Sequence, residues 1–73
     1  MANEEILVAF GKRVRQLRME RKLSQEALGF DVGLDRTYVS DIERGTRNIG
    51  LKNVYALAQT LGITLAQLFE GLE

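Results

Sequence analysis

Apolar side chains recur along this chain at spacings of three and four residues, which is the periodicity of α-helices. The first stripe consists of Ile6, Phe10, Val14 and Leu17, and it predicts a helix over about Glu4–Arg21. Shorter stripes predict further helices over about residues 25–31, 36–44, 51–61 and 65–71. The sequence therefore predicts an all-α fold, a compact bundle of about five helices that forms a single domain over residues 1–73.

Two of these segments carry helix-capping signals and are joined by a tight turn. Ser24 can N-cap the segment 25–31, and Asp35 can N-cap the segment 36–44. Gly33 lies at the turn between them and Gly45 follows the second, where a residue without Cβ adopts positive φ at little cost. Helix, glycine turn and helix form the helix-turn-helix arrangement, here over about residues 24–45, in which the second helix can enter the DNA major groove.

The stretch LSQEALGFDVGLDRTYVSDIERGTRN, residues 23–48, resembles the helix-turn-helix of the phage-repressor-like (XRE-type) family. Its part GLDRTYVSDIERGTRN is similar in particular to controller proteins of restriction–modification systems. The resemblance implies a lambda-repressor-like DNA-binding domain. It also implies a partly buried ion pair between Arg18 and Glu43 that ties the first helix to the recognition helix; two solvated surface charges are the alternative.

The composition excludes several classes of protein. Without Cys or His, the chain has no disulfide, no zinc or thiolate metal site and no His-based catalysis. We expect no catalytic residues, no metal, no cofactor, no small-molecule ligand domain and no enzyme activity. The apolar runs are too short to span a membrane, and the N-terminal MANEEIL lacks the basic region of a signal peptide, so we expect a cytoplasmic protein.

The net charge of +0 and the pI of about 6.3 do not by themselves indicate a DNA-binding protein. The distribution of charge is more informative than its sum. Basic residues gather in the segment 12–22, and acidic residues gather near both ends of the chain. This pattern favours a polarised molecule with one basic face, although ordinary solvated helix faces would produce the same pattern.

The predicted segment 36–44 carries the candidate base-reading side chains. If Val39 and Ile42 face inward, the outward side chains are those of Arg36, Thr37, Ser40 and Asp41. An arginine can donate two hydrogen bonds to guanine O6 and N7, hydroxyl groups can bind a base or a phosphate, and a carboxylate can accept from cytosine N4. Asp41 also lies three residues before Arg44, so an ion pair within the helix is its alternative.

Phosphate contacts are expected at the edges of the motif. The start of a helix attracts anions through its free N–H groups, and cations that follow the recognition helix can clamp the DNA backbone. The candidates are Gln25, Tyr38, Arg44, Arg47, Asn48 and Lys52. For Tyr38, packing against the preceding helix is an equal alternative. The roles of Arg47 and Asn48 are those that the resemblance to controller proteins implies, and a solvated polar turn is the alternative for this loop.

The C-terminal part of the chain is richer in apolar residues than a bundle of this size can bury. The surplus residues are Ile49, Leu65, Leu68, Phe69 and Leu72. They predict a self-complementary dimer interface, with the segment 65–71 as the dimerisation element. A homodimer would place two recognition helices about 34 Å apart on one face of double-stranded DNA. Fraying at the chain end is the alternative for Leu72.

The sequence thus predicts a sequence-specific DNA-binding transcriptional regulator, of which a restriction–modification controller is one case. A helical protein-interaction module or an antitoxin-like protein on the same fold is the alternative. The neutral net charge and the acidic Asp41 favour that alternative, whereas Arg36, Arg47 and Asn48 argue against it.

Overall fold

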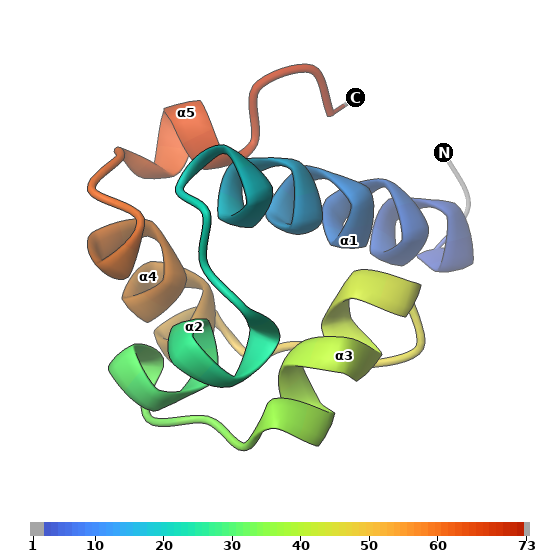
Figure 1. Ribbon diagram of the computed structural model, residues 1–73. Coiled ribbons are helices and arrows are strands. Elements are labelled where there is room, and N and C mark those ends of the chain that lie inside the picture. Colours follow the sequence, from blue (N-terminus) through green and yellow to red (C-terminus); the bar gives the residue numbers. More distant parts are fainter. Residues whose placement is uncertain (1–2, 73) are drawn as a thin grey trace.

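The computed structural model describes residues 3–72, which form the predicted helical bundle. Its helices are α1 (Asn3–Glu20), α2 (Gln25–Val32), α3 (Arg36–Arg44), α4 (Leu51–Thr60) and α5 (Leu65–Leu68). The long α1 runs along one side of the molecule, α2, α3 and α4 lie beneath it, and α5 lies beside its other flank (Figure 1). None of the helices within residues 3–72 combines the length and the apolar content of a membrane span.

The core forms where the apolar stripes of all five helices meet. Its fully buried large side chains are Val14, Leu28, Val39, Ile42, Leu57, Leu61 and Leu68. The rings of Phe10 and Phe69 stack with centroids 5.3 Å apart and close the core between α1 and the chain after α5. Burial of these side chains, rather than the propensity of short helices, is what stabilises α2 and α5.

The boundaries of the helix-turn-helix follow its caps. The Ser24 hydroxyl accepts a hydrogen bond from the N–H of Ala27 at 2.9 Å, and the Asp35 carboxylate accepts from the N–H of Thr37 at 2.8 Å. Gly33 and Gly45 adopt φ of 86° and 78° and end α2 and α3. The predicted caps and the predicted bounds of α3 are confirmed, because capping depends on local sequence alone.

The prediction for the last helix was wrong in length, since α5 ends at Leu68 rather than near Gly71. The chain then turns, with a hydrogen bond from the N–H of Glu70 to the carbonyl of Gln67 at 3.2 Å. Arg13 of α1 donates to the carbonyl oxygens of Gln67 and Leu68 at 2.7 and 3.3 Å. A cation that satisfies the last carbonyls stabilises a helix end, and here that cation comes from another helix.

A glycine in α1 allows that helix to cross α3 at backbone contact. A Cβ atom at Gly11 would overlap the carbonyl oxygen of Ile42 and lie 2.7 Å from that of Glu43. Gly29 likewise allows α2 to approach the backbone of the turn before α3, since a Cβ there would lie 2.5 Å from the carbonyl oxygen of Leu34. These two close approaches set the position of α3 relative to the rest of the fold.

Candidate nucleic-acid interface

The recognition segment α3 presents one apolar face and one polar face. Val39 and Ile42 are buried, with relative exposures of 0% and 1%. Arg36 and Thr37 are exposed on the first turn, and Ser40 is half-buried one turn later. The structure therefore directs the predicted base-reading residues of the first turns away from the core, as their spacing on a helix requires.

A polar depression connects the start of α2 with the outward face of α3. It has a volume of about 290 Å³ and is lined by Gln25, Arg36, Thr37, Ser40 and Arg44. The structure thus brings three predicted base-reading residues together with two predicted phosphate-contacting residues. Among residues 3–72, no side chain or carbonyl makes a hydrogen bond or ion pair with the exposed guanidinium of Arg36, so its donors face solvent.

A buried ion pair fixes α3 from beneath. Arg18 Nε and Nη2 donate to the two carboxylate oxygens of Glu43 at 2.6 and 3.0 Å, and Arg18 Nη1 donates to the carbonyl of Leu23 at 2.7 Å. The two side chains are only 13% and 4% exposed. The hydrogen bond with Glu43 raises the pKa of Arg18 above its ordinary value. The pair that the resemblance implied is therefore present, and it joins α1, the turn after it and α3.

The same carboxylate also holds the start of α2. Gln25 Nε2 donates to Glu43 Oε1 at 3.2 Å. The side chain predicted to contact phosphate is therefore positioned by the buried ion pair. The sequence offers no local signal for this contact, because 18 residues separate its two partners.

The carboxylate of Asp41 is engaged on both of its oxygens. Oδ1 accepts from the guanidinium of Arg44, and Oδ2 accepts from Arg47 Nη2 at 3.2 Å. The hydrogen bond from Arg44, followed by that from Arg47, lowers the pKa of Asp41 below its ordinary range. The side chain is only 18% exposed. Of the two interpretations of Asp41, the structure contains the ion pair, here with two cations, and the base-reading role stays a prediction.

Tyr38 lies between the core and the loop that follows α3. Its ring packs against the core and carries the guanidinium of Arg47 at 4.4 Å from the ring centroid. Its hydroxyl oxygen accepts from Asn53 Nδ2 at 3.5 Å. Tyr38 thus packs against the core and contacts Asn53 of α4, and its ring supports a predicted phosphate-contacting arginine, while its own phosphate contact stays a prediction.

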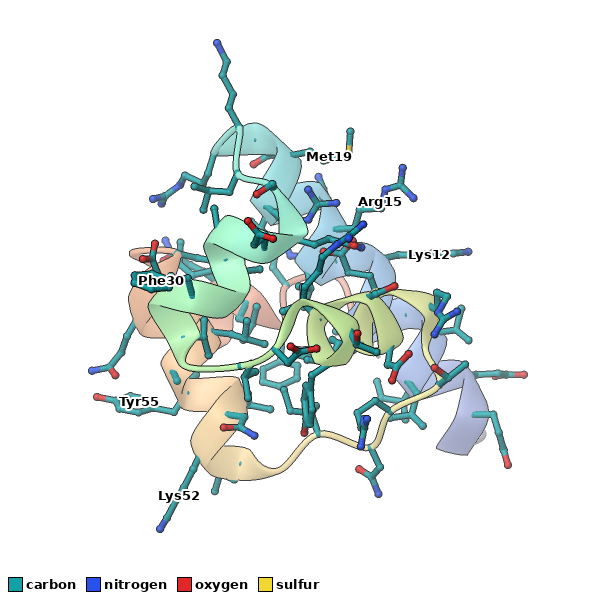
Figure 2. The ribbon with its side chains drawn as sticks, turned by 60° about the horizontal axis from the view of Figure 1, so that its bottom comes forward. Lys12, Arg15, Met19, Phe30, Lys52 and Tyr55 are labelled. Carbon is teal, nitrogen blue, oxygen red and sulfur yellow. The ribbon has the colours of Figure 1, made fainter. Side chains whose placement is uncertain are left out.

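Two other predicted phosphate-contacting residues do not line the polar depression. Lys52 is exposed on the first turn of α4 and extends away from the body of the molecule (Figure 2). Asn48 lines an apolar depression of about 210 Å³ with Ile6, Leu7, Phe10, Ile49, Val54 and Phe69. Asn48 thus lies at the edge of the predicted dimer surface, next to Ile49.

One of the predicted dimer-interface residues is in the interior. Leu68 has an exposure of 0%, so a second chain cannot reach its side chain, and its assignment to an interface was wrong. Burial reflects its position on the inward side of α5, which a helix of one turn could not reveal by periodicity. Leu65 and Phe69 are 38% and 39% exposed, whereas Ile49 and Leu72 are half-buried against the core.

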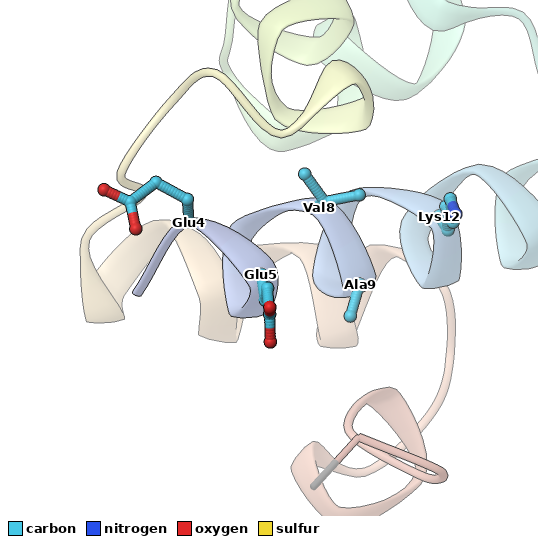
Figure 3. Close-up of a pocket in the computed structure, with 5 residues that line it drawn as sticks. All are labelled: Glu4, Glu5, Val8, Ala9 and Lys12. Carbon is cyan, nitrogen blue, oxygen red and sulfur yellow. The ribbon is translucent and has the colours of Figure 1, made fainter. Parts of the chain in front are cut away.

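A further depression lies on α1 and is separate from these residues. It has a volume of about 370 Å³ and is lined by Glu4, Glu5, Val8, Ala9 and Lys12 (Figure 3). A single helix supplies all of its lining, and none of the predicted site residues belongs to it. Within the described part of the chain, no three His, Cys, Asp or Glu side chains group as a metal site.

Known proteins share both this sequence pattern and this fold. The helix-turn-helix family pattern matches residues 14–68. Control protein C.BamHI of Bacillus amyloliquefaciens is 49% identical over 59 residues, which cover 80% of this chain and 73% of that protein. Control protein C.MunI of Mycoplasma sp. is 44% identical over 70 residues, which cover 94% of this chain and 95% of that protein.

A solved structure agrees with the sequence comparison. The restriction-modification controller protein C.AhdI from Aeromonas hydrophila superposes on 86% of this chain and 96% of its own, with a TM-score of 0.84 and 52% identity. The family pattern covers most of the chain, and the relatives match over most of their own lengths. This chain therefore belongs to the helix-turn-helix family.

Proposed function

We propose that this protein is a transcriptional regulator that binds double-stranded operator DNA in the cytoplasm, with α3 in the major groove. The observation that carries the proposal is the polar depression in which Arg36, Thr37 and Ser40 meet Gln25. Side chains on the first turns of a recognition helix reach base edges, and the start of the preceding helix lies against the DNA backbone. A binding surface of this kind needs no catalytic group, which agrees with a regulator rather than an enzyme.

Within this surface, Arg36 is the principal base reader. Its exposed guanidinium can donate two hydrogen bonds to guanine O6 and N7. Thr37 and Ser40 can bind a base or a phosphate through their hydroxyl groups. Arg44 and Arg47 supply the positive charge beside them, with solvent exposures of 65% and 44%.

The genes controlled are proposed to be those of a restriction–modification system. Relatives named as control proteins match this chain at 49% and 44% identity, and C.MunI does so over nearly the full length of both chains. A chain that shares this length and fold with controller proteins is suited to the same kind of control, in which dimer concentration sets operator occupancy.

Dimerisation is proposed to use the apolar surface around α5. Leu65 and Phe69 expose part of their side chains, and Phe69 and Ile49 line the apolar depression beside them. A self-complementary patch of this kind forms a two-fold interface. Leu65→Asp should shift the protein to the monomer in sedimentation equilibrium. Leu51→Asp is the matched control, because Leu51 is also the first residue of a helix and is 77% exposed.

DNA binding is tested by titrating wild type and Arg36→Ala with DNA from upstream of the protein's own gene and with scrambled DNA, over a range of salt concentrations. The wild type should bind its own upstream DNA preferentially, with a steep salt dependence from phosphate contacts. Arg36→Ala should keep that slope and lose about 5- to 150-fold of the preference, since a bidentate contact is worth about 1–3 kcal/mol. Absence of specific binding by the wild type at low salt would favour a protein-interaction module.

A further inference from the structure

The carboxylate of Asp41 joins two arginines from different segments of the chain. Arg44 belongs to the last turn of α3, and Arg47 belongs to the loop that follows. Each donates to a different oxygen of the same carboxylate, Arg44 to Oδ1 and Arg47 to Oδ2 at 3.2 Å. One side chain therefore binds both guanidinium groups.

Arg47 is held on a second side as well. Its guanidinium carbon lies 4.4 Å from the centroid of the Tyr38 ring, whose π face attracts a cation. Tyr38 is itself packed against the core. A long side chain on an exposed loop would otherwise sample many rotamers, and here the carboxylate and the ring together restrict it.

The backbone beneath the cluster is also restrained. The N–H and the hydroxyl of Thr46 both donate to the carbonyl of Asp41, at 3.0 and 3.2 Å. Gly45 adopts a φ of 78° in close contact with α1, where a Cβ would lie 2.7 Å from the Cα of Val8. The loop that carries Arg47 is thus fixed to α3 and α1.

The outer sides of both guanidinium groups remain accessible. Arg44 and Arg47 are 65% and 44% exposed, whereas the carboxylate between them is 18% exposed. A guanidinium has five N–H donors, and each arginine uses its Nη2 on Asp41. The other donors are free for a ligand, and Arg44 also lines the polar depression beside Arg36, Thr37 and Ser40.

We propose that Asp41 is a positioning residue for DNA binding, which holds Arg44 and Arg47 at the spacing required to bind phosphates on operator DNA. This inference rests on the proposed function. The negative charge of Asp41 offsets one positive charge of the surface. The same carboxylate orders both arginines before DNA binds, so that less side-chain conformational entropy is lost on binding. Because phosphate contacts fix the register of a protein on DNA, two ordered arginines should favour the operator, where α3 also reads bases, over non-specific DNA.

The test compares Asp41→Asn with Asp31→Asn, which removes the same charge from the exposed end of α2, away from this cluster. Binding to operator DNA and to scrambled DNA is measured for each variant, after circular dichroism has shown that both are folded. Asp41→Asn should lower the ratio of operator to scrambled affinity about tenfold, with scrambled binding unchanged or tighter. Asp31→Asn should leave the ratio unchanged.

A double-mutant cycle separates positioning from base reading. In an Arg44→Ala/Arg47→Ala background, Asp41→Asn should have no further effect on the ratio, because the groups that it positions are gone. An effect that persists there, or one confined to a single operator base pair, would assign Asp41 to base reading and overturn the inference. Equal shifts for Asp41→Asn and Asp31→Asn would also overturn it, since the carboxylate would then act only as a charge.

The failure of the proposed function gives a different result. If the wild-type protein shows no preference for operator DNA over scrambled DNA, the proposed function as a DNA-binding regulator is contradicted. If the wild-type protein prefers its operator and Asp41→Asn keeps the same ratio of operator to scrambled affinity, only the proposed role of Asp41 is contradicted.

Discussion

Two arginine–carboxylate clusters lie two residues apart on α3 and have opposite surroundings. Glu43 points toward α1 and is 4% exposed, and its partner Arg18 is 13% exposed. Asp41 points outward to Arg44 and Arg47, which are 65% and 44% exposed. Both clusters pair guanidinium groups with one carboxylate, and the exposure of the arginines distinguishes the cluster that holds the fold from the one that is available to a ligand.

The physical reason for the difference is desolvation. Removing one partner of a buried pair leaves a charge without water or counter-ion, which is costly, whereas an exposed charge is solvated again at once. The buried cluster should therefore govern stability, and the exposed cluster should govern DNA binding. The following predictions test this separation.

Glu43→Ala should produce the largest effect. It leaves the Arg18 guanidinium buried without its carboxylate and should lower the free energy of unfolding by about 3–5 kcal/mol. A domain of this size has only about 5–15 kcal/mol in total, so the variant should be close to unfolding. Urea denaturation followed by circular dichroism measures the loss.

The control for Glu43→Ala is the double substitution Arg18→Met/Glu43→Leu. Replacing both partners of a buried pair with apolar side chains of similar volume is often neutral, so most of the lost stability should return. A loss below about 1 kcal/mol for Glu43→Ala would mean that the pair behaves as a surface pair and would remove the contrast between the clusters.

Gly11→Ala should be the next largest effect, because Gly11 allows α1 to approach Glu43. The added methyl meets the carbonyl oxygens of Ile42 and Glu43, which belong to backbone and cannot move aside easily. The free energy of unfolding should fall by about 1–3 kcal/mol, as for other overpacked sites. Gly50→Ala is the control, since a Cβ there meets nothing within 4 Å; equal losses at both positions would contradict the close crossing.

Arg47→Ala should change DNA binding and leave the urea midpoint nearly unchanged. The loss of one phosphate contact should reduce the slope of log affinity against log salt by about 1. Gln59→Glu on the exposed end of α4 lowers the net charge by the same amount and should leave the slope unaltered. A large loss of stability in Arg47→Ala would mean that the outer cluster, like the Arg18–Glu43 pair, stabilises the fold, and would contradict the separation of roles.

The smallest expected effect is a change in the pKa of Asp41 when one of its two arginine partners is removed. The hydrogen bond from Arg44 is the main cause of its lowered pKa, so Arg44→Ala should raise that pKa more than Arg47→Ala. A carboxylate with a lowered folded-state pKa stabilises the fold above its ordinary pKa of about 3.9 and loses that contribution as the pH falls through the folded value. Carboxyl-carbon NMR titration measures the shift; a pKa that is insensitive to both substitutions would contradict the ion pairs.

Local sequence was sufficient for the helix-turn-helix itself. Ser24, Asp35 and Gly45 act within a few residues of their own positions, so caps and bounds could be predicted from neighbouring residues. The end of α5 could not, because the cation that satisfies its last carbonyls is Arg13, 54 and 55 residues away in sequence. The burial of Leu68 depends on the same packing of α5 beside α1.

The sequence by itself determined which segments are helical, where α3 begins, and that Arg36 and Thr37 face outward, because caps and periodicity act over one or two turns. Only the tertiary structure decided that Gln25 joins the Arg18–Glu43 pair, and that glycine is needed at positions 11 and 29, where glycine weakens a helix. Those choices depend on distances between segments that are remote in sequence. Burial then made one carboxylate part of the scaffold and left the other beside solvent.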